Sequence, residues 1–157
     1  MADGVFNIAK GRVVEFYNRV ENNDPAAAVL RIYLLTVNQV DATLIDHDDM
    51  AALLAAANTE ALFTNYVNKV LTDTDLAPLP APDDSADRYE VDIPNIVWTA
   101  AGNGVNETMT KFIVAYDALG TDVDSGILPL THHDFTPTTD GSDLTAVINA
   151  LGFFRAA

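Results

Sequence analysis

Residues 26–37, AAAVLRIYLLTV, constrain the fold more than any other stretch of this chain. The run becomes β-branched and aromatic towards its end, and both of its alternating sets are apolar, with Ile32 and Leu34 in one and Tyr33 and Leu35 in the other. Successive side chains of a strand point to opposite faces, so a strand of this kind is covered on both. The sequence therefore predicts a central strand.

Two segments predict helices. The first is an apolar stripe at the spacing i, i+3, i+4 and i+7, which is typical of an amphipathic helix and predicts one over about residues 9–21. The second predicts a shorter helix over about residues 46–57, with Asp46 as its N-cap, Asp49 three residues later and an alanine and leucine run that stops at Asn58.

Beyond residue 60 the apolar pattern changes to a period of two, which is typical of strands with one solvated face. The predicted strands span residues 63–72, 88–93, 95–101, 110–118, 126–135 and 144–154. Residues 72–87 are rich in proline and aspartate and predict a surface loop. These features predict an α+β, mainly-β fold: an antiparallel β-sandwich or barrel-like sheet with an N-terminal helix and a second short helix, as one domain over residues 1–157.

The net charge of −15 is concentrated after residue 40. Of the 23 acidic and 8 basic residues, four of each precede residue 41, which leaves nineteen acidic and four basic residues in the remainder. A surface of this kind repels phosphate backbones, so we predict no nucleic-acid partner. No apolar run approaches the ~18 residues that span a bilayer, so we predict no membrane partner either. The neutral N-terminal part is the expected docking end.

The histidine pair in LTHHDFTP, residues 130–137, is the first candidate for chemistry. Adjacent residues on a strand point to opposite faces, so His132 and His133 cannot share one metal ion while the strand continues. A zinc site needs three or four convergent ligands, and the remaining histidine, His47, lies in a helix-start motif. The pattern favours a strand end, with one ring packed and one solvated, over a metal site or a catalytic base beside Asp134.

Two aspartate clusters, DHDD at 46–49 and DGSD at 140–143, offer oxygen ligands for calcium, but neither has the spacing of an EF-hand loop. Helix capping explains the first cluster and turn chemistry the second. We therefore predict no functional metal and no cofactor, and a structural calcium ion is left open.

The sequence also lacks an evident catalytic motif. There is no cysteine, and no GxSxG elbow surrounds the serines, which stand in aspartate-rich turns at positions 85, 125 and 142. The glutamates, at positions 15, 21, 60, 90 and 107, fall on helix faces, strand exteriors or loops. Gly102 and Gly104 lack the third glycine and the following helix of a phosphate loop. We predict that the protein is not an enzyme.

Five aromatic residues fall on the periodic faces of the predicted strands: Tyr66, Tyr89, Trp98, Phe112 and Tyr116. Together they resemble a carbohydrate platform, but core packing is the more frequent use of such residues. We interpret Trp98 as a core anchor.

The order of four segments carries a family resemblance: Asp92–Trp98, Phe112–Gly120, Ile127–Phe135 and Leu144–Phe154. Together with AKGRVVEFYNRV and LRIYLLT nearer the N-terminus, this order resembles a family of small virion proteins of tailed bacteriophages. The resemblance covers most of the chain and implies a head decoration or accessory structural role. Its motifs are fold-level features, and none implies a catalytic residue.

We therefore expect a non-enzymatic capsid decoration protein, made in the host cytoplasm and bound in many copies to the outer shell of a virion. Its expected partners are the major capsid protein and further copies of itself. The alternative is a tail or fibre-associated adhesion module that binds a host surface glycan. The expected interface is Val13, Phe16, Tyr17, Val20, Phe153 and Phe154, because one of two adjacent phenylalanines on an extended chain must point away from its own core.

Overall fold

The secondary structure of this chain is given by a computed structural model that describes residues 3–156. The predicted domain also includes residues 1, 2 and 157, which lie outside the described residues. The strands are β1 (Gly4–Val5), β2 (Val29–Val37), β3 (Thr59–Glu60), β4 (Lys69–Leu71), β5 (Tyr89–Val91), β6 (Ile96–Trp98), β7 (Lys111–Asp117), β8 (Ile127–Asp134), β9 (Leu144–Ala146) and β10 (Phe154–Ala156). The helices are α1 (Val13–Glu21), α2 (Asp41–Leu44) and α3 (Met50–Ala55), with short 3-10 helices at Asn7–Ala9, Asp73–Asp75 and Asp124–Gly126.

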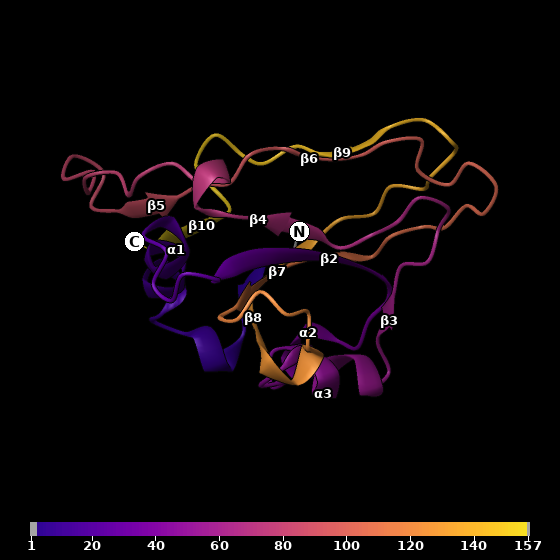
Figure 1. Cartoon of the computed structure of the whole chain (residues 1–157), viewed down its shortest axis with the longest axis horizontal. Coiled ribbons are helices and arrows are strands. Elements are labelled where there is room, and N and C mark those ends of the chain that lie inside the picture. Colours follow the sequence, from indigo (N-terminus) through magenta and orange to yellow (C-terminus); the bar gives the residue numbers. More distant parts are fainter. Residues whose placement is uncertain (1–2, 157) are drawn as a thin grey trace.

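A six-stranded antiparallel sheet forms the central layer of the described residues. Its strand order is β1-β8-β7-β2-β3, and β4 pairs with β2 next to β3. Two small antiparallel sheets, β5 with β10 and β6 with β9, lie over one face, whereas α2 and α3 lie under the other (Figure 1). The mainly-β α+β class predicted from the sequence is confirmed, and within residues 3–156 the sheet does not close into a barrel.

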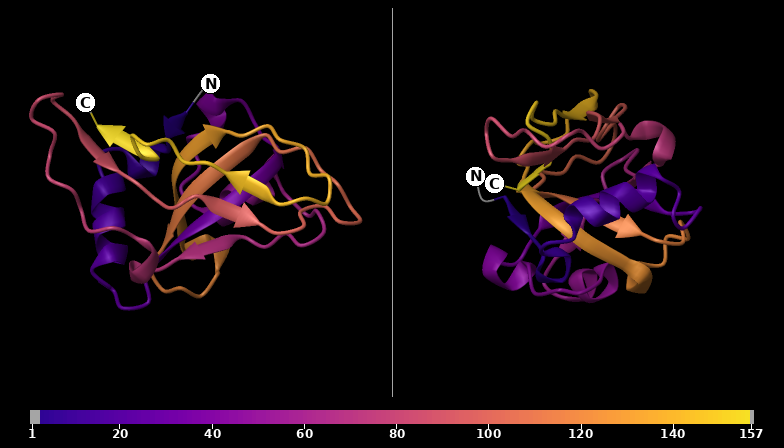
Figure 2. Two further views of the ribbon diagram at one scale, coloured as in Figure 1. Left: turned by 90° about the horizontal axis from the view of Figure 1, so that it is seen from above. Right: turned by 90° about the vertical axis from the view of Figure 1, so that its left-hand side faces the viewer.

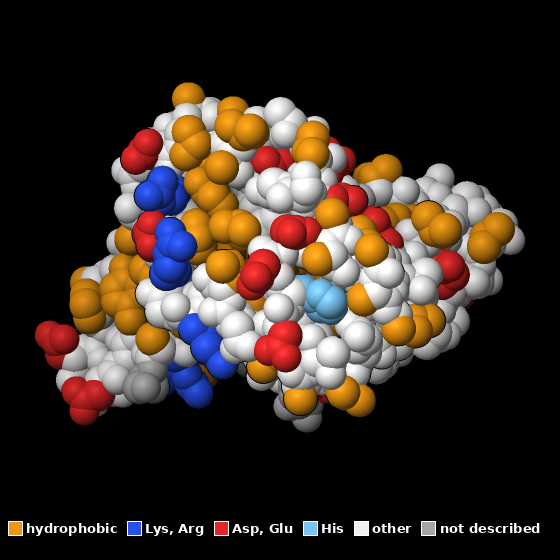
Figure 3. All heavy atoms as spheres, turned by 90° about the horizontal axis from the view of Figure 1, so that it is seen from below, with side chains coloured by type: hydrophobic (Ala, Val, Ile, Leu, Met, Phe, Trp, Pro, Cys, Tyr) orange, Lys and Arg blue, Asp and Glu red, His pale blue; other side chains and the backbone are white. Residues whose placement is uncertain are grey.

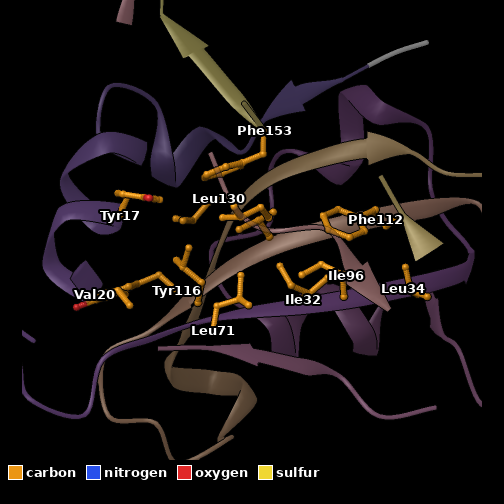
Figure 4. Close-up of a cluster of buried hydrophobic side chains, with 14 of the residues drawn as sticks. Tyr17, Val20, Ile32, Leu34, Leu71, Ile96, Phe112, Tyr116, Leu130 and Phe153 are labelled. Carbon is orange, nitrogen blue, oxygen red and sulfur yellow. The ribbon is translucent and has the colours of Figure 1, made fainter. Parts of the chain in front are cut away.

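The central sheet is buried on both faces, as the apolar run around β2 predicts. Leu30, Ile32 and Leu34 join the larger core, which α1 and the small sheets cover. Tyr33 and Leu35 point the other way into a second core against α2 and α3. Figure 4 shows part of the larger core, where side chains from α1, β2, β7, β8 and the C-terminal segment meet.

The helices are shorter than the sequence predicts. Helix α1 begins at Val13, because Gly11 has a positive φ of 75° and separates it from the 3-10 helix before it. Of the second predicted helix, over about residues 46–57, only α3 forms, and α2 lies before that range. The expected N-cap is wrong. Asp49 caps α3 by accepting a hydrogen bond from the N–H of Ala52 at 2.7 Å, whereas Asp46 accepts one from the Asn7 amide at 2.5 Å.

Several predicted strands are also shortened, and one is divided. Only Lys69–Leu71 of the segment 63–72 is a strand. The segment 144–154 contains β9 and the start of β10, separated by a turn in which the N–H of Gly152 donates to the carbonyl of Asn149. Gly152 has a φ of 81°, and a Cβ there would lie 2.2 Å from the Val91 carbonyl oxygen, so the turn requires glycine.

A buried charge stands at each end of β7. Lys111, its first residue, contacts Asp134 at 2.5 Å and Asp41 at 2.7 Å. Asp117, its last residue, accepts a hydrogen bond from Arg31 of β2 at 2.9 Å and further bonds from the backbone N–H groups of the turn that follows. Burial alone would raise the pKa of Asp117, but the Arg31 guanidinium and these backbone donors hold it below its usual value.

We expect Asp117→Ala to lower the free energy of unfolding by roughly 1–3 kcal/mol, because it removes the buried partner of Arg31 and frees several backbone donors, while the half-exposed Asp122 still pairs with Arg31 at 3.1 Å. Urea unfolding at neutral pH measures the change. The control is Glu15→Ala, which removes the exposed ion pairs to Arg12 and Arg19 and should have little effect. Equal unfolding midpoints for both variants would contradict the role given to Asp117.

Candidate functional site

A groove of ≈ 710 Å³ lies between β1, at one edge of the central sheet, and the C-terminal segment of the chain. Its residues come from 3–5 at β1, from Phe112 of β7, from the end of β8 through Phe135, and from the stretch that leads from the end of β9 into β10. Both views of Figure 2 place β1 and β10 on the same side of the molecule. The groove is therefore built by parts of the sequence that lie furthest apart.

Much of the groove lining is apolar. Phe112 and Phe135 pack edge to face there, with ring centroids 6.1 Å apart. Val147, with 75% of its surface exposed, and Leu151, with 39%, stand on the C-terminal side, and Phe154 is half-buried beside them. Exposed apolar side chains that gather in one concave site are typical of a surface that binds another molecule.

Three of the polar side chains that line the groove, those of Asp3, His133 and Thr131, contact one another in sequence. The Nδ1 atom of His133 lies 3.6 Å from a carboxylate oxygen of Asp3, and its Nε2 atom is 3.0 Å from the hydroxyl of Thr131. Burial lowers the pKa of His133, and the Asp3 carboxylate opposes that shift. His133 is therefore a predominantly neutral, hydrogen-bonding group at neutral pH.

The order carboxylate, imidazole, hydroxyl is that of a nucleophilic triad, but the hydroxyl is in the wrong place for attack. Thr131 is 1% exposed, so a substrate in the groove does not reach its oxygen. The contact instead fixes the ring of His133 against Phe112, whose centroid is 6.1 Å away. This arrangement supports recognition rather than acyl transfer.

His132 points to the opposite face of β8, as predicted for adjacent strand residues. It is 2% exposed and packs edge to face on Phe6, with centroids 5.7 Å apart. Its Nδ1 atom has no hydrogen-bond partner within residues 3–156. Burial, with a smaller contribution from Lys111, lowers its pKa. Asp134 contacts Lys111.

The other sequence candidates lie apart from the groove and from one another. His47 contacts the side chain of Gln39 at 2.7 Å, and the hydroxyls of Ser85 and Ser142 donate to Asp83 and Asp140 within their own turns. Over residues 3–156, no three histidine or acidic side chains are close enough together to hold a metal ion.

Glu60 is a residue whose environment the sequence did not reveal. Burial raises its pKa, while a hydrogen bond from the hydroxyl of Tyr66 at 2.8 Å partly opposes the shift. That hydroxyl also accepts a bond from the N–H of Leu34. The Glu60 carboxylate, the Tyr66 hydroxyl and the N–H of Leu34 are thus linked by hydrogen bonds. Neither Glu60 nor Tyr66 lines the groove, so we assign them a structural role.

The aromatic residues do not form an exposed platform. Trp98, Phe112 and Tyr116 are each at most 4% exposed, and Tyr66 and Tyr89 are half-buried against the core. The indole N–H of Trp98 donates to the carbonyl of Val67 at 2.9 Å. The interpretation of Trp98 as a core anchor is confirmed.

The expected interface needs correction. Val13, Phe16, Tyr17 and Val20 are at most 3% exposed, because the stripe of α1 packs on the central sheet. Phe153 is 7% exposed and stacks on Tyr17, with centroids 6.4 Å apart (Figure 4). The helix and the C-terminal segment thus pack against each other inside one chain. Phe154 remains half-buried at the groove.

Comparison of the chain with protein-family models, with curated proteins and with solved structures finds no match in any of the three. No helix among the described residues is long and apolar enough to cross a membrane.

We expect the free energy of unfolding to fall as the pH decreases from ~7.5 to ~5.5. Unfolded histidines bind protons near their ordinary pKa of about 6.5, whereas His132 and His133 resist protonation when folded, so acid favours the unfolded chain. Urea unfolding at both pH values measures the slope. His132→Leu should reduce that slope, and an identical pH dependence in the variant and the parent chain would show that His132 does not contribute.

Proposed function

We propose that this chain is a non-enzymatic structural protein of a tailed-phage virion, most simply a decoration protein bound on the outside of the shell in many copies. Its proposed partners are the major capsid protein and further copies of itself. The observation that carries the proposal is the open apolar groove, whose polar triad has its hydroxyl buried and whose exposed side chains suit binding rather than chemistry. The resemblance of the segment order to phage virion proteins supports the same role.

The charge distribution also supports a place on the outside of a particle. Acidic side chains are spread over the face that carries α2 and α3, whereas lysine and arginine gather towards one side of it (Figure 3). A net charge of −15 keeps neighbouring copies from nonspecific association at high local concentration. The glycan-binding alternative has less support, because the aromatic residues that it needs are buried or half-buried.

Copy number per particle tests the proposal. Gel densitometry of purified virions should give a ratio of this chain to the shell subunit near one to one or another simple ratio. A ratio of a small fraction would favour a tail or fibre component, and the absence of the chain from purified virions would refute the proposal.

Attachment should survive high salt. Exposed ion pairs contribute about 0–1 kcal/mol each, and raising sodium chloride from ~0.1 to ~1 M shortens the screening length from about 10 to about 3 Å. Attachment through apolar area is insensitive to this change, so the protein should stay bound to particles pelleted at either concentration. Its release at ~1 M would mean that ion pairs to the acidic surface hold it.

A further inference from the structure

We propose that the protonation state of His132 controls the docking of β1: a proton on its imidazole releases residues 3–6 from β8 while the rest of the chain stays folded. Three observations carry this proposal. The ring is buried, its Nδ1 atom has no hydrogen-bond partner within residues 3–156, and it packs directly on β1. Release opens the outer edge of β8, and an open strand edge can pair with another extended chain.

Strand β1 is attached to the sheet by few backbone contacts. It has two residues, Gly4 opposite His132 and Val5 opposite Thr131. The N–H of Phe6, the next residue, donates to the carbonyl of Leu130 at 3.0 Å. A pairing this short adds little stability by itself, so the docking of β1 depends on the side chains that pack across it.

The ring of His132 packs on β1 and on the residue that follows it. It lies so close to Gly4 that a Cβ added there would overlap its Nε2 atom. On the same side it packs edge to face on Phe6, which is fully buried. Departure of residues 4–6 would therefore uncover the ring.

The neutral and the charged forms of His132 differ in what they require. The protonated ring carries a positive charge and an N–H on both nitrogens, and the Nδ1–H has no acceptor within residues 3–156. An uncompensated buried charge is costly, whereas the same ring in water is solvated. Protonation therefore favours the released state, in agreement with the lowering of the His132 pKa by burial.

The charged groups around His132 do not compensate a proton on it. The carboxylates of Asp41, from α2, and Asp134 favour the charged form, but both contact the ammonium of Lys111, from β7. Lys111 and His133 oppose the charged form. The 3-10 helix that follows β1 and helix α3, which also pack against β8, contain no charged residue.

His133 provides a matched control, because its contact with the N-terminal segment has the opposite expected effect. It lies on the other face of β8, with its Nδ1 atom 3.6 Å from a carboxylate oxygen of Asp3. A proton on His133 attracts that carboxylate and so favours docking. The two histidines share a strand and a titration range, and only His132 is predicted to release β1.

Amide hydrogen exchange followed by NMR at pH ~7.5 and ~5.5, corrected for the intrinsic exchange rate, tests the release. Docking is complete above the ordinary histidine pKa of about 6.5 and weakens as the pH falls below it, by up to about tenfold over this range for one proton. The protection of the Phe6 amide should fall at least about threefold at pH ~5.5. A smaller fall would overturn the inference.

The amides of β7 distinguish local release from unfolding of the whole chain. Because β7 is a buried central strand, its amides exchange only through larger openings. At pH ~5.5 the Phe6 amide should exchange at least about tenfold faster than they do. Exchange of Phe6 and β7 at one common rate would mean that β1 does not leave separately, and would overturn the inference.

Two variants assign the response to His132. His132→Leu cannot be protonated, so its Phe6 protection should differ less than about twofold between the two pH values. His133→Gln removes the neighbouring imidazole and should keep the response of the parent chain. Persistence of the response in His132→Leu, or its loss in His133→Gln, would show that another group controls β1. Urea midpoints at pH ~7.5 establish that each variant is folded.

A further pair of variants tests the contact at neutral pH, without any change in protonation. Gly4→Ala places a Cβ against the His132 ring, so the Phe6 protection at pH ~7.5 should fall about tenfold. Gly4→Ala in a His132→Ala chain has room for that Cβ and should change the protection less than about twofold relative to His132→Ala alone. An equal loss in both chains would show that the ring does not hold β1, and would overturn the inference.

Discussion

Burial of β2 and β7 on both faces is the constraint on which the rest of the structure depends. Residues 29–35 of β2 and all of β7 are buried, so each face of the central sheet needs a cover. Helix α1 and the small sheets cover one face, and α2 and α3 cover the other (Figure 1). The apolar stripe of α1 is used for this purpose, which is why it does not serve as a docking surface.

The two charges at the ends of β7 restrict how its neighbours pair. A buried ion pair adds little stability compared with apolar residues, but a buried charge without its partner is costly. A one-residue slip of β7 would separate Lys111 from Asp134 and Asp117 from Arg31 at the same time. The pairs therefore disfavour alternative registers, and the correct register places His133 and Thr131 on the groove side of β8.

The parts of the fold that have a local signal were predictable from the sequence. The two-sided apolar run of β2 and the stripe at Val13–Val20 predict their elements because burial sets their periodicity. Strands β1 and β3 have two residues each, too few to show a period. The N-cap of α3 was misplaced because Asp46 and Asp49 are chemically equivalent candidates, and only the contact of Asp46 with Asn7 distinguishes them.

The groove had no such signal, because it joins residues about 130 positions apart and each of its stretches resembles ordinary strand or turn sequence.

The side chains of the groove nevertheless differ from those of the rest of the surface. Single exposed valines and leucines occur on any protein and need no explanation. Val147 and Leu151, in contrast, stand together in one groove, beside the half-buried Phe154. A chain with 23 acidic residues has an ample supply of charged side chains to cover such a surface. The groove nevertheless keeps its apolar lining, and that favours a surface that is covered when the protein is in its working assembly.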